Sequence, residues 1–179
     1  MEDKDLIRYS RHIMLPEIDI EGQISISSSK IAVVGLGGLG CSASVYLAAS
    51  GVGELNLIDN DLIDLSNLQR QILFSEADLN KKKVDTAKIK LSSLNEDIKV
   101  NSSNLRLNKS NIRKILEGSE IVLDCTDNFE IRKVINAYCL KEKKILISGS
   151  SQGWKGQFFA LDFRLSLIHI SEPTRRTQI

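Results

Sequence analysis

A glycine-rich loop between an apolar run and a small-residue segment constrains the fold of this chain more than any other feature. Lys30 to Val34 (KIAVV) is short, apolar and rich in β-branched residues, as is typical of a buried strand. It leads into the loop GLGGLG at 35–40, and the small-residue segment Gly38 to Ala49 is predicted to be helical. A strand, a tight glycine turn and a helix in this order form the first unit of many nucleotide-binding sheets.

The rest of the chain continues the alternation of strands and helices. We predict strands at Glu54–Ile58, Lys99–Ser103, Glu120–Asp124, Lys144–Ser148 and Gly156–Asp162, and helices at Asp5–Met14, Lys83–Leu94, Asn111–Leu116 and Asn128–Leu140. Short joins between them predict an α/β fold: a Rossmann-like doubly wound, mostly parallel sheet with helices on both faces, preceded by N-terminal helical structure. Functional residues should then follow the carboxyl ends of the strands, at Gly35, Asp59, Asp124, Asp127 and Gly149.

Composition narrows the function classes. With 24 Lys+Arg against 23 Asp+Glu the formal net charge is +1, which gives no electrostatic footprint for nucleic acid or a membrane surface. The charged N-terminus lacks an apolar signal core, so we expect a cytoplasmic protein. Cys41, Cys125 and Cys139 lie far apart and form no CxxC pair, so they predict neither a zinc site nor a disulfide framework.

The last sixteen residues differ in character from the rest. Leu165 to Arg175 (LSLIHISEPTR) resembles the in-frame translation of a transposase adapter used in short-read library preparation. We therefore expect an incomplete nucleotide-binding domain at 1–163 and a non-native tail at 164–179, which is left out of the fold argument. A genuine polar tail is the alternative.

The glycine loop and an acidic partner predict a nucleotide site. Gly35, Gly37, Gly38 and Gly40 allow a tight turn, close approach to phosphate and close packing of helix on strand. The helix that begins there offers unpaired N–H groups to an anion. Asp59 ends the next strand, where a carboxylate accepts bonds from ribose hydroxyls. The loop alone does not separate NAD, FAD and ATP, and by itself it favours a dinucleotide.

The residues after Asp59 favour a triphosphate. Arg70 and Lys83 follow in a polar region, and two cations converging on one site offset the charge on phosphate oxygens during a displacement. Asp124 and Asp127 fall where a hard cation could sit between protein and phosphates. Each residue also has an ordinary structural interpretation: a surface arginine, a solvated lysine run, and a helix N-cap for Asp127.

Five separated motifs together resemble the adenylyltransferase family that activates ubiquitin-like proteins. Its bacterial members are the molybdopterin-synthase and thiamine-biosynthesis adenylyltransferases (MoeB/ThiF/HesA type). The resemblance spans residues 4 to about 163 and lies in RYSR (8–11), GLGGLGC (35–41), LID with Asp61 (57–61), SNLQRQ (66–71) and DCTDN (124–128), with Lys83 beyond them. A single glycine motif is weak evidence, but this ordered set is specific.

The resemblance implies a reaction and a set of roles. The C-terminal glycine carboxylate of a ubiquitin-like sulfur-carrier protein, ending in Gly-Gly, would attack the α-phosphate of ATP and release pyrophosphate, for molybdopterin or thiamine sulfur transfer. Asn67, Arg70 and Lys83 would contact phosphates, Asp127 would bind Mg²⁺, and Arg11 would reach the site of the neighbouring subunit in a homodimer. The nucleotide site would also include Asp61, Ser66, Leu68, Gln69 and Asn128.

Some family features differ or are missing. Lys81 and Lys82 stand where relatives often have Gly and Pro. Paired CxxC motifs are missing, so a structural Zn²⁺ would belong to a C-terminal part beyond residue 163, and no catalytic thiol is assigned. Two alternatives stay open: an NAD(P)-dependent oxidoreductase, and an inactive truncated binding remnant. Preference for NAD over ATP–Mg²⁺ would identify the first, and the retained Arg70, Lys83 and Asp127 argue against the second.

Overall fold

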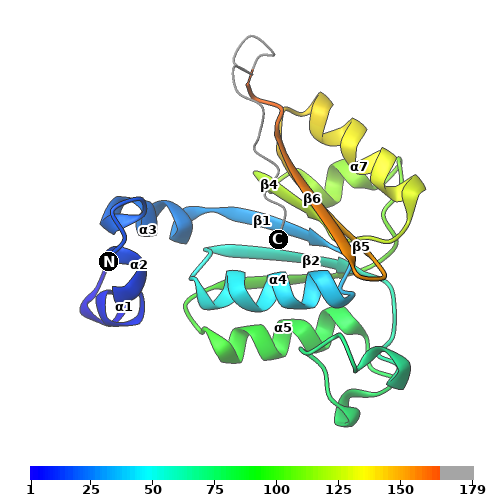
Figure 1. Cartoon of the computed structure of the whole chain (residues 1–179), viewed down its shortest axis with the longest axis horizontal. Helices are drawn as coiled ribbons and strands as arrows, with labels where there is room; N and C mark the ends of the chain where they lie inside the picture. Colours follow the sequence, from blue (N-terminus) through cyan, green and yellow to red (C-terminus); the bar gives the residue numbers. More distant parts are fainter. Residues whose placement is uncertain (166–179) are drawn as a thin grey trace.

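A computed structural model describes residues 1–165, which form a six-stranded sheet with helices against both faces (Figure 1). The elements in chain order are α1 (Asp3–Arg8), α2 (Ser10–Ile13), α3 (Asp19–Ser28), β1 (Lys30–Val34), α4 (Gly38–Ala49), β2 (Glu54–Asp59), the 3₁₀ turns η1 (Leu65–Asn67) and η2 (Glu76–Asp78), α5 (Lys83–Leu94), β3 (Lys99–Asn104), α6 (Ile112–Leu116), β4 (Ile121–Asp124), α7 (Phe129–Lys141), β5 (Ile145–Gln152) and β6 (Lys155–Asp162).

The sheet has the order β3-β2-β1-β4-β5-β6, and only its last pair, β5 with β6, is antiparallel. Consecutive parallel strands need a crossover, and helices supply it between β1 and β2 and between β4 and β5. The predicted doubly wound, mostly parallel fold is therefore confirmed. Strand order reverses between β1 and β4, so the loops after these two strands diverge and open a crevice at the carboxyl edge.

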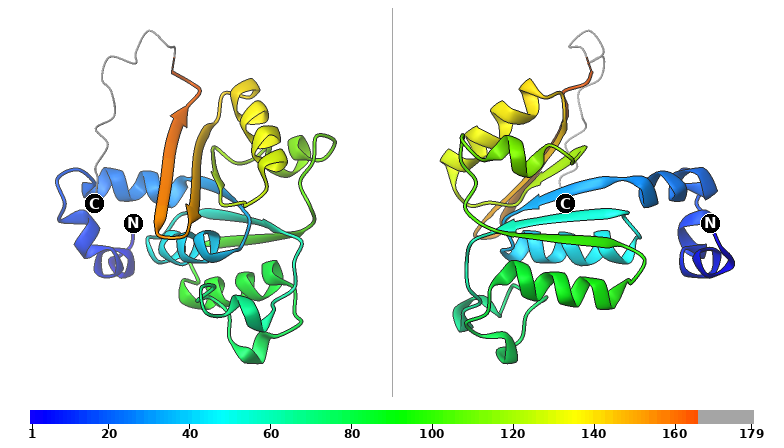
Figure 2. Two further views of the ribbon diagram at one scale, coloured as in Figure 1. Left: turned by 45° about the vertical axis from the view of Figure 1, so that its right-hand side comes forward. Right: turned by 180° about the vertical axis from the view of Figure 1, so that it is seen from behind.

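Two apolar cores lie on opposite faces of the sheet. One joins the sheet to α4 and α5, with Leu55, Leu57 and Leu91 fully buried. The other joins it to α6 and α7 and contains Leu116 and Ile135. Figure 2 shows α4 and α5 on one side of the strands and α7 on the other. Because the central strands β1, β2 and β4 are packed between helices on both faces, their carboxyl ends are fixed in place for a site.

The N-terminal helices differ from the prediction. One helix was expected over Asp5–Met14, but α1 ends before Tyr9 and α2 follows it. Tyr9 leaves the helical conformation (φ −102°, ψ 17°) because its side chain is buried, where its hydroxyl accepts a hydrogen bond from Asn95 (2.9 Å). Helix α3 was missed, since Ile and Ser alternate over Ile24–Ser27 with the period of a strand.

One further prediction concerns the C-terminal end of the chain. The tail predicted at 164–179 lies outside the described residues, apart from its first two. Among the helices of the described residues, none combines the length and apolar character that crossing a bilayer requires.

Candidate functional site

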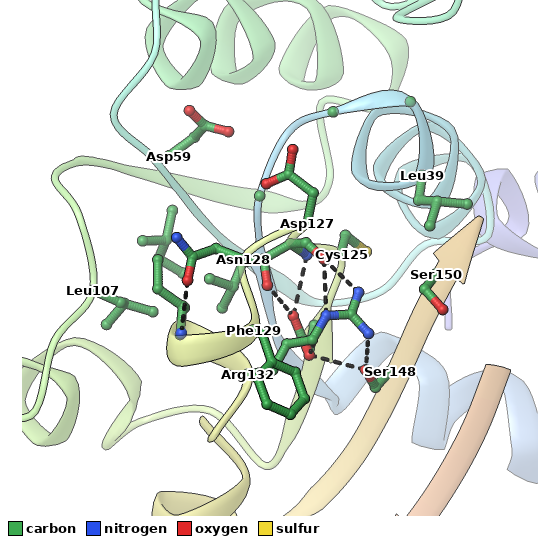
Figure 3. A pocket seen from close by; sticks show the side chains of 18 of the residues that line it. Leu39, Asp59, Leu107, Cys125, Asp127, Asn128, Phe129, Arg132, Ser148 and Ser150 are labelled. Atoms are coloured by element: carbon green, nitrogen blue, oxygen red, sulfur yellow. Dashed lines mark hydrogen bonds and ion pairs between the residues drawn. The ribbon is translucent and has the colours of Figure 1, made fainter. Parts of the chain in front are cut away.

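A cavity of about 1060 Å³ opens at the carboxyl edge of the sheet (Figure 3). Its wall comes from the glycine loop after β1, the ends of β2, β4 and β5, and the start of α7. This volume is that of a small-molecule site, and its place is where ligands bind in open α/β sheets. The predicted residues that line it are Gly35, Gly37, Gly38, Asp59, Asp61, Asn67, Arg70, Lys83, Asp127 and Asn128.

The glycine loop brings backbone close to this cavity. Gly35 has φ +90°, a left-handed conformation that glycine adopts without strain. Gly37 is the N-cap of α4 and has no side-chain cap, so the amides of the first turn face the cavity unpaired by any side chain. A Cβ at Gly37 would meet nothing within 4 Å, which leaves room for an anion at the helix start.

Asp59 holds the loop and faces the cavity. Its Oδ2 accepts the Leu36 N–H (2.6 Å), and its Oδ1 accepts the Asp61 N–H (2.7 Å). Each carboxylate oxygen has a further lone pair for a ligand hydroxyl. The strand end, the glycine loop and this carboxylate therefore form one preorganised unit.

Two cationic side chains, those of Lys83 and Arg70, also line the cavity. Lys83, at the start of α5, is only 3% exposed, and its Nζ donates to Asp61 Oδ2 (2.9 Å). Arg70 donates from Nη1 to the Ser66 carbonyl (3.2 Å) and packs beside Gly38, where a Cβ would lie 3.4 Å from the Arg70 carbonyl oxygen. A buried cation paired with one exposed carboxylate suits an anionic ligand.

The amide of Asn67 is oriented by a residue that the sequence prediction missed. Gln71, 2% exposed, donates from Nε2 to Asn67 Oδ1 (2.7 Å), while Asn67 Nδ2 donates to Ser66 Oγ (3.0 Å). This arrangement occupies the acceptor of Asn67 and leaves an N–H of its amide to a ligand. Gln71 Oε1 is buried and has no partner among the described residues.

Asp127 has the surroundings of a carboxylate that binds a nucleotide-borne cation. It is exposed at the cavity wall, and the N-cap of α7 is Asn128, whose Oδ1 accepts the N–H groups of Glu130 (3.0 Å) and Ile131 (3.2 Å). The described residues contain no group of three metal-ligating side chains. One carboxylate fits Mg²⁺, which keeps waters and takes phosphate oxygens as further ligands.

Several predicted residues lie away from the cavity wall. Gly40 packs under the loop, Leu68 is half-buried against the core, and Ser66 and Gln69 are exposed, so their ligand contacts stay predictions. Arg11 is exposed on α2, near the amino end of β1 and far from the carboxyl edge (Figure 1).

Arg132 and Ser148, which the sequence prediction missed, do line the cavity. Only one feature of the sequence could have indicated Arg132: it lies one helical turn after Asn128 and therefore on the same side of the predicted helix.

None of the three thiols has the lowered pKa of an activated nucleophile. Burial raises the pKa of Cys41 to about 12 and that of Cys125 and Cys139 to about 11. A thiol with such a pKa has almost no thiolate at neutral pH. The site therefore offers phosphate-binding groups and a carboxylate rather than a covalent nucleophile.

Comparison with known proteins gives consistent matches. The ThiF family matches residues 9–176. Molybdopterin-synthase adenylyltransferase of Haemophilus influenzae is 46% identical over 157 residues, which are 88% of this chain and 65% of that protein. Sulfur carrier protein ThiS adenylyltransferase of Escherichia coli is 42% identical over 161 residues, 90% of this chain and 64% of that protein. The chain thus spans just under two thirds of the length of these curated relatives.

Solved structures agree with the sequence matches. The crystal structure of E. coli MccB with ATP has a TM-score of 0.72 at 33% identity and covers 80% of this chain and 44% of that one. MccB with succinimide has a TM-score of 0.77 at 32% identity and covers 85% of this chain and 46% of that one.

Proposed function

The chain belongs to the ThiF family, and we propose from that premise that its site adenylylates the C-terminal glycine carboxylate of a ubiquitin-like sulfur-carrier protein. ATP is the proposed second substrate and pyrophosphate the product. One observation carries the proposal: Arg70, Lys83 and Asp127 converge on the cavity that the glycine loop and Asp59 also line. An oxidoreductase that transfers a hydride has no need of two cations and a free carboxylate around its cofactor's phosphates.

The relatives support this choice over the alternatives. Curated proteins at 46% and 42% identity are named adenylyltransferases, one for molybdopterin synthase and one for the sulfur carrier ThiS. A related solved structure contains ATP. Neither an NAD(P)-dependent oxidoreductase nor an inactive binding remnant has comparable support, because this chain retains each charged residue that a triphosphate would need.

The proposed chemistry is an in-line displacement at phosphorus. A carboxylate oxygen of the carrier forms a bond to the α-phosphorus, and the bond to the bridging oxygen of the leaving pyrophosphate breaks. The protein has little covalent work to do, so positioning and charge stabilisation must supply most of the rate. Arg70 and Lys83 offset charge on the phosphates, the Asn67 amide donates to them, and Asp59 orients the ribose.

Asp61 has a supporting part in this proposal. Its carboxylate pairs with the Lys83 ammonium, which is almost fully buried. Without Asp61, the Lys83 ammonium would lose the carboxylate with which it pairs. Asp61 therefore holds the Lys83 ammonium at the cavity wall before substrate binds.

Asp127 is the proposed protein ligand of Mg²⁺. When bound, the cation would neutralise phosphate charge and polarise the α-phosphate. A structural Zn²⁺ in a C-terminal part beyond residue 163 stays a prediction from the family resemblance.

A homodimer with Arg11 acting in trans extends the proposal. Arg11 is exposed on α2, beyond the amino end of β1, so it does not reach the cavity of its own chain in this arrangement. In the proposed dimer it would add a third cation to the partner subunit's phosphate site.

The test is pyrophosphate exchange into ATP, measured with a sulfur-carrier protein that ends in Gly-Gly. We expect carrier-dependent exchange, and we expect Asp127→Ala and Lys83→Ala each to reduce it by about 10²-fold or more. Lys141→Met, an exposed change at the end of α7, is the control and should keep full exchange.

Three outcomes would contradict parts of the proposal. Exchange that is unchanged by Asp127→Ala would remove the metal role from that residue. Binding of NAD in preference to ATP–Mg²⁺ would favour an oxidoreductase. Nucleotide binding without any exchange would favour a binding protein.

A further inference from the structure

The loop that carries Asp127 has no regular secondary structure, yet hydrogen bonds to the buried Asp124 carboxylate hold it in place. Asp124 ends β4 and is 2% exposed. Its Oδ1 accepts the Thr126 N–H (3.1 Å) and the Thr126 Oγ1–H (2.7 Å), while its Oδ2 accepts the Ser148 Oγ–H (2.9 Å). The buried Asp124 carboxylate therefore fixes the loop to the ends of β4 and β5 through Thr126 and Ser148.

Arg132, which lies in the first turn of α7, also bonds to this loop (Figure 3). Its Nε donates to the Thr126 carbonyl (3.0 Å), a bond that Nη2 shares, and Nη2 also donates to the Gly149 carbonyl (2.6 Å). Its Nη1 reaches Ser148 Oγ (3.4 Å), and Nε lies 3.8 Å from Asp124 Oδ2. The guanidinium thus links the loop after β4 to the end of β5.

Among the acceptors of Arg132, the Thr126 carbonyl matters most for Asp127, because its carbon is bonded to the backbone nitrogen of Asp127. It belongs to the peptide unit whose nitrogen is that of Asp127, and this unit is planar. Arg132 therefore fixes the orientation of the peptide plane that leads into Asp127. On the far side of Asp127, the cap made by Asn128 fixes the next backbone step. The exposed carboxylate of Asp127 owes its direction to these two backbone anchors.

Arg132 suits a backbone role better than a direct contact with substrate. Its planar fork matches two carbonyl oxygens at once, which a lysine ammonium does not reproduce. Its side chain is 20% exposed, and most of its N–H groups are already bonded within the protein. The sheet does not depend on it, because β4 and β5 pair directly through Ile121–Asp124 and Ile145–Ser148.

We infer that Arg132 is a positioning residue that presets the Asp127 carboxylate for a nucleotide-bound divalent cation. This inference rests on the ATP–Mg²⁺ binding of the proposed function. Removing the guanidinium should loosen the Thr126–Asp127 peptide, so the cation would lose a preorganised ligand while the rest of the nucleotide site stays intact. Groups that orient a metal ligand typically contribute 10–100-fold to metal affinity or activity.

The test compares binding of a non-hydrolysable ATP analogue with and without Mg²⁺, by calorimetry on the 179-residue chain. In wild type, Mg²⁺ should tighten binding. In Arg132→Met this gain should shrink by about tenfold, with affinity in EDTA changed less than about twofold. Arg132→Lys should behave like Arg132→Met, because it keeps the charge but loses the fork. Arg113→Met removes an exposed arginine of α6 and is the matched control, expected to keep the full Mg²⁺ gain.

A double-mutant cycle separates positioning from general structure. In an Asp127→Asn background, Arg132→Lys should have almost no further effect on the Mg²⁺ gain, since the group it positions is already gone. Additive effects would overturn the inference, and so would a Mg²⁺ gain that survives in both Arg132 variants. Thermal melting checks that each variant is folded. If Arg132→Met melts at a lower temperature than wild type, Arg132→Lys and the double-mutant cycle still test the positioning role.

Failure of the proposed function gives a different result. A chain that shows the Mg²⁺ gain and its dependence on Arg132, but no pyrophosphate exchange, would refute adenylylation and leave the positioning role standing.

Discussion

At the scale of single residues, Gly40 is the position with the least tolerance. It is the third residue of α4, and a Cβ there would lie 1.8 Å from the Gly35 carbonyl oxygen. That contact is with backbone, so no side-chain rotation relieves it, and the glycine loop itself would have to move. The close approach of α4 to the loop, which directs its amides at the cavity, thus depends on the missing side chain.

We expect Gly40→Ala to destabilise the fold by about 1–3 kcal/mol, the usual range for overpacking, and to weaken ATP binding. Gly37→Ala is the comparison for stability, since its Cβ would meet nothing within 4 Å. Urea unfolding of both variants measures the effect. Equal stability of the two variants would show that the loop shifts easily, and the packing role of Gly40 would be wrong.

At the residue scale, the structure brings several residues that the sequence motifs singled out to one cavity, while their ligand contacts stay predictions. The glycine loop, Asp59 and Lys83 all line the cavity, because loop, strand end and helix start follow one another along the chain. Gln71 and Arg132 were missed because their roles come from bonds to Asn67 and to two backbone carbonyls, which no spacing rule identifies. No catalytic thiol was assigned from the sequence, and in the structure burial raises the pKa of Cys41 and Cys125.

At the scale of elements, the segment between β2 and α5 has a buried carboxylate as one of its anchors. Asp78, in η2, is 7% exposed. Its Oδ2 accepts hydrogen bonds from the Lys90 ammonium of α5 and from the Ser75 N–H (3.0 Å). Its Oδ1 accepts a hydrogen bond from the Lys81 ammonium (3.3 Å). The hydrogen bond from Lys90, followed by that from Ser75, holds the pKa of Asp78 well below its usual range. This segment carries Arg70 and Asn67, so the anchor also supports the site.

The pH dependence of this anchor follows from the lowered pKa. A carboxyl whose pKa is lower in the folded state contributes stability above its unfolded pKa, about 3.9, and loses it as pH falls toward the folded value. We therefore expect Asp78→Asn to lower stability at pH 7 by about 1–3 kcal/mol, with the difference from wild type shrinking below pH of about 4. Unfolding in urea at pH 7 and pH 3 measures this. A difference of the same size at both pH values would show that charge is not the cause.

Element boundaries were predicted well for some elements and poorly for others. β5 was predicted to end at Ser148 with Gly149 after it, but its pairing with β6 extends it to Gln152, so Gly149 lies inside the strand. The predicted β1 and α5 have the observed bounds, since strong apolar patterns with clear breaks define both. The split between α1 and α2 depends on the contact of Tyr9 with Asn95, far along the chain, and a Cβ at Gly51 would lie only 2.3 Å from the Tyr9 hydroxyl. Local periodicity contains no information about such a contact.

At the scale of the whole molecule, the described sheet ends in an exposed antiparallel strand. Trp154 is fully exposed, and on β6 the exposures are 83% for Phe158, 44% for Phe159 and 39% for Leu161. In the described part of the chain, β6 pairs only with β5, so its outer edge offers unpaired backbone groups. An apolar, uncovered edge strand is a template for association.

We expect the 179-residue chain to self-associate through β6. Sedimentation velocity should show species heavier than a monomer whose share rises with concentration, and Phe158→Lys should shift them toward monomer, because a charge on an edge strand opposes pairing. Thermal stability should stay close to wild type, since Phe158 contributes little to the core. A sample that remains monomeric at every concentration would refute this role of β6. A discrete dimer that persists in Phe158→Lys would instead place the contact on another surface, as the proposed homodimer with Arg11 in trans requires.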